Sequence, residues 1–179
     1  RPPPRSTRFP YTTLFRSFDD AKRIGISEEP GWKLRARLFF ESSRGCWWGQ
    51  KHQCSFCGLN GNGLAYRAKS AERVIGTLKN FADLYPASTY QASDNNMSPE
   101  YFETFLPRIR DDPPKRGARL LYEVKTDLTR SQIRALADAG VIYLQPGIES
   151  LSTHLLYLMR KGTTAIKNLF FLKCCRTYG

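Results

Sequence analysis

The sequence contains no apolar run that approaches the roughly 18 residues of a membrane-spanning helix. Nothing at its start reads as a signal peptide, because residues 1–5 (RPPPR) lead into no apolar stretch. We therefore expect a protein of the reducing cytoplasm. Its five cysteines are then expected to bind metal or to take part in catalysis, since disulfides are rare in that setting.

Acidic residues are also scarce, with 16 Asp and Glu against 28 Lys and Arg in 179 residues, which gives a net charge of +12. The apolar share of 41% and the charged share of 25% are ordinary for a globular domain and exclude wholesale disorder. The basic residues are scattered, with no run of five, so the sequence favours a solvated basic surface. Attraction for an anionic partner such as RNA is the alternative.

Residues 11–17 (YTTLFRS) look like a sequencing adapter translated in frame, so we expect residues 1–17 to be non-native. That segment carries four arginines and no acid, and without it the net charge of +12 falls to +8. Residues 18–33 are then a linker. Residues 34–179 form the expected core domain, truncated at its C-terminal end.

From residue 34 onward, short apolar runs alternate with segments of helical periodicity. Strands are expected over residues 34–41, 88–92, 120–124 and 141–148. Helices are expected over residues 70–85, 98–106, 129–139, 152–161 and 164–176. The glycine-rich stretch 42–69 is expected to be a long loop, and loops of that length are usually functional. Four β-α units predict an α/β fold with a parallel sheet, which is an open or partial barrel.

Several residues mark the ends of the expected helices. Ser70 is a candidate N-cap, and Thr129 with Gln132 fits a capping box. Gly140 is expected to stop the helix that begins after Thr129. Pro107 is expected to kink or end the helix over residues 98–106.

Polar residues follow each expected strand, in the segments 41–46 (ESSRGC), 93–96 (SDNN), 123–127 (EVKTD) and 145–150 (QPGIES). The carboxyl ends of parallel strands meet at one edge of the sheet, where α/β proteins carry their chemistry. The sequence therefore predicts a functional site at this edge.

Three cysteines, Cys46, Cys54 and Cys57, lie in the expected loop with the spacing C-x7-C-x2-C. Thiolates suit iron–sulfur clusters, zinc and copper(I). Three of them on a four-iron cluster would leave one iron open to a small molecule, whereas His52 as a fourth ligand would close a zinc site. The spacing alone leaves both interpretations open.

The segments RGCWWG (residues 44–49) and CSFCGLNG (residues 54–61) resemble the cluster loop of radical SAM enzymes. These enzymes place three cysteines after the first strand, with an aromatic residue, here Phe56, directly before the last one. The usual family spacing is C-x3-C-x2-C, and the first gap in this chain is longer.

The longer gap, the WWG motif and the segment LAYRAKS (residues 64–70) are similar to radical SAM maturases of ribosomally made peptides. The resemblance continues in three later motifs: YEVK (122–125), QPGIESL (145–151) and LMRKG (158–162). It spans roughly residues 36–179.

The resemblance implies a partial (β/α) barrel of the TIM type, in which the three cysteines hold a [4Fe–4S] cluster. The cluster would cleave S-adenosylmethionine to a 5′-deoxyadenosyl radical that modifies a ribosomally made precursor peptide, with C-methylation as one candidate reaction. An electron donor such as flavodoxin or ferredoxin is implied, and neither a membrane nor a nucleic acid is an expected partner. Many of these maturases also use cobalamin, so the resemblance makes it a further candidate cofactor, which we would expect a domain outside this chain to bind.

The same resemblance suggests cofactor contacts besides Phe56. Asp94 and Asn95 stand where the family contacts the methionine amino group, although this chain has no Gly-Gly-Glu there. Glu149 would meet the ribose hydroxyls or the amino group. Lys125 would pair with the methionine carboxylate, and Glu123 would orient Lys125. The alternatives are a turn at residues 94–95 and a structural ion pair between Glu123 and Lys125.

A competing hypothesis is a zinc-stabilised basic module that binds RNA or another anionic partner. It needs His52 or another side chain as the closing ligand, and it predicts no dependence on S-adenosylmethionine. It leaves the β-α repeat and the acidic strand ends unexplained.

Overall fold

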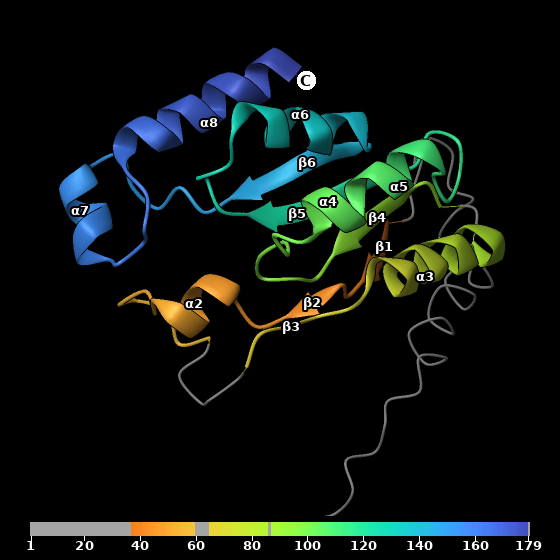
Figure 1. Ribbon diagram of the computed structural model, residues 1–179, viewed down its shortest axis with the longest axis horizontal. Helices are drawn as coiled ribbons and strands as arrows, with labels where there is room; N and C mark the ends of the chain where they lie inside the picture. The colour runs from red at the N-terminus through yellow and green to blue at the C-terminus, as the bar shows by residue number, and fades with distance from the viewer. Residues whose placement is uncertain (1–36, 60–64, 86, 179) are drawn as a thin grey trace, which may run out of the picture. The chain divides into compact units, whose positions relative to one another are not determined.

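A parallel sheet of four strands organises the computed structural model, which describes residues 37–59, 65–85 and 87–178 (Figure 1). The strands, in their order across the sheet, are β1 (Arg37–Phe40), β4 (Thr89–Ala92), β5 (Arg119–Val124) and β6 (Val141–Pro146). All three pairings are parallel. The sequence order is thus also the order in the sheet, as in consecutive units of a (β/α) barrel, and the predicted fold class is confirmed. The expected segments 1–17 and 18–33 lie outside the described residues.

A helix or a pair of helices follows each strand. These are α3 (Ala71–Leu84), α4 (Tyr101–Thr104), α5 (Leu106–Asp111), α6 (Arg130–Asp138), α7 (Thr153–Leu158) and α8 (Ala165–Tyr178). The helices α4, α5, α6 and α8 form a continuous layer along the sheet (Figure 1). Within the described part of the chain, none of the helices has the length and apolar character needed to span a membrane.

The predicted helix signals are confirmed. The Ser70 hydroxyl accepts a hydrogen bond from the backbone of Arg73 and caps α3. Thr129 and Gln132 form the expected reciprocal capping box at the start of α6. Gly140 ends that helix at a φ of 78°, a left-handed conformation that favours glycine. Pro107 lies in the first turn of α5, after a break that separates α5 from α4.

The main core lies between the sheet and the helices. In β1, Leu38 and Phe40 are buried, whereas Phe39 between them is 57% exposed. Leu120 of β5 and Leu136 of α6 are fully buried, which is what the alternation of strand side chains and the apolar stripe of a helix require. On β6 at the sheet edge, Tyr143 is 61% exposed, so the side of the sheet away from the main core remains open among the described residues.

The expected loop over residues 42–69 contains secondary structure, which corrects the sequence prediction. Ser43–Arg44 (β2) pairs with Arg67–Ala68 (β3) in an antiparallel ribbon, and Trp47–Lys51 forms a short helix, α2. Two-residue strands carry too little periodicity to be recognised in a sequence. The ribbon brings the two ends of the segment together, and α2 lies on the side toward which β5 and β6 point (Figure 1).

The core of α6 provides a test of the packing. Leu136→Ala is expected to lower the free energy of unfolding by about 2–5 kcal/mol, because the deleted methyl groups leave a cavity in a fully buried position. Arg134→Ala on the same helix is the control. Its side chain is 67% exposed and forms a surface ion pair with Asp138, so the expected loss is about 0.5 kcal/mol or less. Urea denaturation measures both, and equal losses would contradict this view of the core.

Candidate functional site

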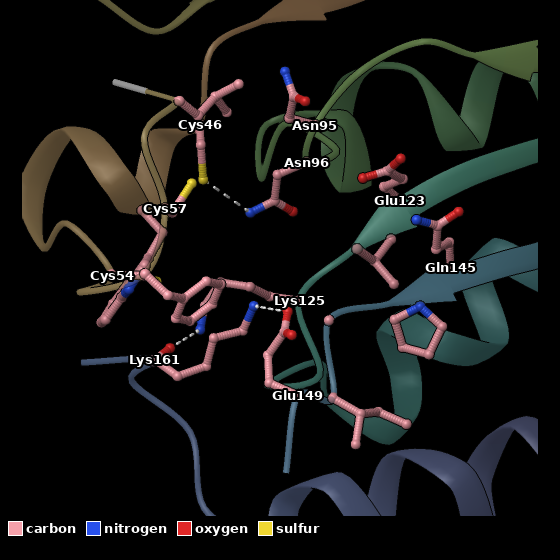
Figure 2. Close-up of a pocket in the computed structure, with 17 residues that line it drawn as sticks. Cys46, Cys54, Cys57, Asn95, Asn96, Glu123, Lys125, Gln145, Glu149 and Lys161 are labelled. Carbon is pink, nitrogen blue, oxygen red and sulfur yellow. Dashed lines mark hydrogen bonds and ion pairs between the residues drawn. The ribbon is translucent and has the colours of Figure 1, made fainter. Parts of the chain in front are cut away.

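A cavity of about 480 Å³ lies at the carboxyl ends of the strands (Figure 2). Figure 2 shows residues 46–57, the cysteine segment, on one side of it and Glu123 and Gln145 on the opposite side. The lining residues come from all four polar segments that follow the strands, and they include Cys46, Cys54, Cys57, Asn95, Asn96, Glu123, Lys125, Gln145, Glu149 and Lys161. The predicted gathering of polar side chains at this edge is therefore confirmed.

Cys46 is held at the start of α2. Its sulfur accepts a hydrogen bond from the backbone of Gly49 at 3.5 Å, so the thiol caps the helix. The side-chain amide of Asn96 donates to the same sulfur at 3.9 Å (Figure 2). Gly45, at a φ of 82°, precedes Cys46 and packs closely against the backbone of Tyr66. The sulfur is thus placed by two donors and by a constrained backbone.

Cys54 and Cys57 lie in a tight turn, as the C-x-x-C spacing predicts. The backbone N–H of Cys57 donates to the carbonyl of Cys54 at 3.1 Å. The thiol of Cys54 lies 3.8 Å from the carbonyl oxygen of Arg160. Burial raises the pKa of the Cys54 thiol, and the nearby ammonium of Lys161 opposes that rise.

The three cysteines share one cavity, but they do not form a ready-made site for a single ion. Among the described residues, no three His, Cys, Asp or Glu side chains are grouped to hold one metal ion. His52, the expected closing ligand for zinc, stacks on Trp48 with 4.6 Å between ring centroids and does not line the cavity. Thiolates that hold a cluster bind different irons, so they need not converge on one point.

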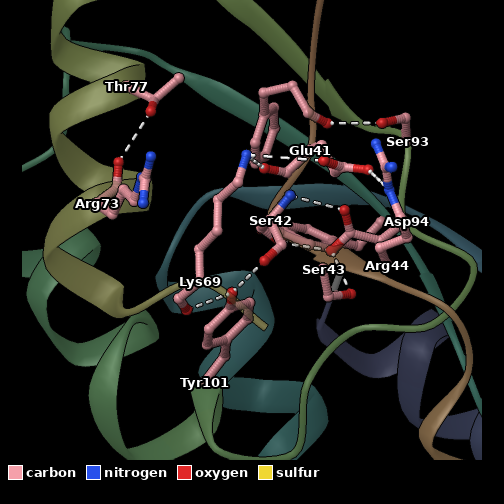
Figure 3. Close-up of polar contacts among 12 residues, drawn as sticks. Glu41, Ser42, Ser43, Arg44, Lys69, Arg73, Thr77, Ser93, Asp94 and Tyr101 are labelled. Carbon is pink, nitrogen blue, oxygen red and sulfur yellow. Dashed lines mark hydrogen bonds and ion pairs between the residues drawn. The ribbon is translucent and has the colours of Figure 1, made fainter. Parts of the chain in front are cut away.

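Asp94, which was expected to meet the methionine amino group, is buried and is not among the residues that line the cavity. Its buried carboxylate accepts hydrogen bonds from the Ser42 backbone at 2.8 Å, from the Ser43 hydroxyl at 2.9 Å and from the Ser42 hydroxyl (Figure 3). Tyr101 donates to the Ser42 carbonyl at 2.7 Å. Asp94 therefore ties the segment after β1 to the end of β4, just ahead of Cys46.

Asn95 and Asn96 occupy the part of the cavity expected for residues 94–95. Asn95 is exposed, and Asn96 is 4% exposed. The carbonyl oxygen of the Asn96 side chain is buried without a hydrogen-bond partner among the described residues, and Asn96 lines the cavity. Sequence reasoning missed Asn96, although it belongs to the same SDNN segment.

Lys125 is buried, with 6% of its side chain exposed, and in the part of the chain that the structure describes no hydrogen bond or ion pair joins it to Glu123. Its ammonium donates to the carbonyl of Lys161 at 2.9 Å, lies 3.5 Å from the Asp127 carboxylate and sits 4.3 Å from the Trp48 ring centroid. Lys125 is the first residue after β5, which ends at Val124. Burial lowers the pKa of Lys125, and Asp127 opposes the shift.

Glu149 lies at the cavity as expected, with its carboxylate 2.9 Å from the ammonium of Lys161. The same ammonium lies 5.7 Å from the ring centroid of Phe56, which is 53% exposed and also lines the cavity. A Cβ on Gly147 would come within 2.7 Å of that ammonium, so the glycine makes room for it. Sequence reasoning gave Lys161 no role, although it lies in the quoted LMRKG motif.

A family model described as the radical SAM superfamily matches residues 40–176. A search of curated proteins found no match. The matched span includes the three cysteines and every other residue named above as lining the cavity.

Solved structures share the fold. The radical S-adenosylmethionine methyltransferase TsrM from Kitasatospora setae, with tryptophan substrate and a SAM analogue bound, aligns with a TM-score of 0.66 and 18% identity over 81% of this chain and 29% of its own. The cobalamin-dependent S-adenosylmethionine radical enzyme OxsB, with aqua-cobalamin bound, aligns with a TM-score of 0.61 and 22% identity. The alignment covers 82% of this chain and 23% of OxsB. Methylornithine synthase (PylB) aligns with a TM-score of 0.58 and 19% identity, over 94% of this chain and 49% of its own. The chain thus spans less than half of each of these structures.

Glu123 provides a pH-dependent test of the cavity wall. Burial, with a contribution from the charge of Asp94, raises its pKa above that of a glutamate in the unfolded chain. Between the two pKa values the folded state binds more protons, so stability falls as pH rises through this window. Glu123→Gln is expected to be more stable than the wild type at pH 7.5, with no such gain below about pH 4.

Urea denaturation at the two pH values measures this difference. Glu103→Gln, at an exposed position on α4, is the control and is expected to give no comparable gain at pH 7.5. A Glu123→Gln variant that is less stable than the wild type at pH 7.5 would show that the carboxylate is stabilised where it lies.

Proposed function

The chain belongs to the radical SAM superfamily, and from this premise we propose that it holds a [4Fe–4S] cluster on Cys46, Cys54 and Cys57 and binds S-adenosylmethionine beside it. The observation that carries the proposal is the shared cavity, which the three thiols line together with the polar ends of the strands. Three thiols provide one ligand fewer than the four irons of such a cluster need, which suits a cluster with one iron open to a substrate.

The residues of the cavity fit these two groups. The thiols supply the soft ligands that iron–sulfur clusters take. The buried, unpartnered oxygen of Asn96 would accept a hydrogen bond from the amino group of S-adenosylmethionine. Lys161 and Glu149, paired with each other at 2.9 Å, offer one cationic and one anionic group to a zwitterionic ligand with ribose hydroxyls.

When bound, the two cofactors would supply radical chemistry that removes hydrogen from a substrate. The protein residues position the cofactors and restrict access to them. Trp48 and Phe56 give the cysteine side of the cavity an aromatic wall. The buried ammonium of Lys125 lies against the ring of Trp48 and donates to the carbonyl of Lys161, so it holds Lys161 in place at the cavity.

The proposed substrate of the whole protein is a ribosomally made precursor peptide, with C-methylation as the candidate reaction. The WWG, QPGIESL and LMRKG motifs support this proposal through their similarity to peptide maturases. A flavodoxin or ferredoxin would supply the electron, and the net positive charge favours such an acidic donor. Cobalamin, which is bound in another structure of TsrM and in that of OxsB, would be bound by a separate domain of the whole protein.

Metal analysis after anaerobic purification and reconstitution tests the cluster. The wild-type chain is expected to bind about four irons and four sulfides, and Cys54→Ala is expected to lose most of both because it removes one of three ligands. Cys175→Ala is the matched control, since Cys175 lies on α8 and does not line the cavity. With dithionite as the reductant, wild type and control should form 5′-deoxyadenosine from S-adenosylmethionine.

One zinc per chain with no uptake of iron would contradict the proposal and favour a structural metal module. Equal iron content in Cys54→Ala and Cys175→Ala would contradict the assignment of the ligands. These two outcomes are distinguishable, because the first concerns the metal and the second concerns the residues.

A further inference from the structure

The cysteine segment rests on the C-terminal end of α7, more than 100 residues further along the chain. The backbone N–H of Ser55 donates to the carbonyl of Met159 at 3.0 Å, and its hydroxyl donates to that of Leu158 at 3.2 Å. The indole N–H of Trp48 donates to the carbonyl of Arg160 at 3.2 Å. The last carbonyls of a helix have no partner inside the helix, so Ser55 satisfies two groups that the end of α7 leaves free, and Trp48 binds the carbonyl that follows them.

Lys125 extends the same row of contacts. Its ammonium donates to the carbonyl of Lys161, the residue after Arg160, and lies over the ring of Trp48. Four consecutive carbonyls, those of residues 158–161, therefore accept hydrogen bonds from the cysteine segment or from the end of β5. A buried ammonium needs hydrogen-bond partners, and Lys125 finds one in the same row of carbonyls that binds the cysteine segment.

Gly162 is a further contact between the two segments, because the indole of Trp48 lies directly against its backbone. A Cβ at residue 162 would come within 2.0 Å of Cζ2 and 2.2 Å of Cη2 of Trp48, a separation that real atoms do not adopt. The residue also has a φ of 67°. Gly117 has a similar φ of 75°, but a Cβ there would meet nothing within 4 Å. The close approach at Gly162 is therefore a separate requirement from its backbone conformation.

We propose that Trp48 and Gly162 form a clamp that positions the Cys54–Cys57 turn for cluster binding. The inference rests on the proposed function, and it assigns the segment between α7 and α8 to the cluster site. Trp48 connects the clamp to the cysteines, because it belongs to α2, the helix that Cys46 caps. Gly162 acts only through Trp48, so both are positioning residues.

Gly162→Ala and Gly117→Ala in the full chain test the clamp. Both variants place alanine at a positive φ and carry the same kind of backbone cost, but only Gly162→Ala displaces Trp48. After anaerobic reconstitution, Gly117→Ala is expected to keep the iron content and the electron paramagnetic resonance spectrum of the reduced wild type. Gly162→Ala is expected to lose most of the iron, or to keep it with shifted g values and a weaker response to S-adenosylmethionine.

Trp48→Phe is a milder variant, and it keeps the test valid if Gly162→Ala does not fold. It removes the indole N–H and the atoms that face Gly162, and it keeps an aromatic ring. We expect its melting temperature to stay near that of the wild type while the g values shift. In the double variant Trp48→Phe with Gly162→Ala, the alanine is expected to cost no more iron than Gly117→Ala does, because its steric conflict is gone.

The outcomes separate the clamp from the proposed function. A wild-type chain that takes up no iron would overturn both. If the wild type and Gly117→Ala hold the cluster, and Gly162→Ala and Trp48→Phe hold it with an unchanged spectrum, only the clamp is overturned. A loss of iron in Gly162→Ala that the double variant does not reduce would also overturn the clamp, because it would not act through Trp48.

Discussion

The parallel alignment of four strands is the constraint on which the rest of the structure depends. It sends every strand's carboxyl end to the same edge of the sheet, so segments far apart in the sequence meet there. The cysteine segment follows the first of these strands, and Lys125 and Glu149 follow the last two. No one segment could form the cavity, because its walls come from all four β-α units.

Two buried charged side chains, Asp94 and Lys125, hold this edge together through separate sets of partners. Asp94 accepts three hydrogen bonds from Ser42 and Ser43 and joins the ends of β1 and β4. Lys125 joins the end of β5 to the segment after α7. A charged group is costly to bury unless it is paired and hydrogen-bonded, so both side chains constrain the backbone around them. The Asp94 contacts fix the backbone just ahead of Cys46, and the Lys125 contact fixes the segment against which Cys54 lies.

Local signals made most of the fold predictable. Ser70, Thr129 with Gln132, and Gly140 act within a few residues of themselves, and each forms the expected cap or stop. The short ribbon of β2 and β3 was not predictable, because two-residue strands depend on a partner more than 20 residues away. Asn96 and Lys161 were missed for the same reason, since their roles come from contacts with Cys46 and Glu149 across the cavity.

The sequence by itself determined the α/β class, the position of the site at the strand ends and the cysteines that line it, because periodicity, capping and spacing are local properties. Only the tertiary structure decided that Asp94 faces Ser42 and Ser43, that Lys125 pairs with Asp127 and not with Glu123, and that Trp48 lies against Gly162. Side-chain direction beyond the end of a strand depends on how distant segments pack, and residue spacing along the chain does not encode it.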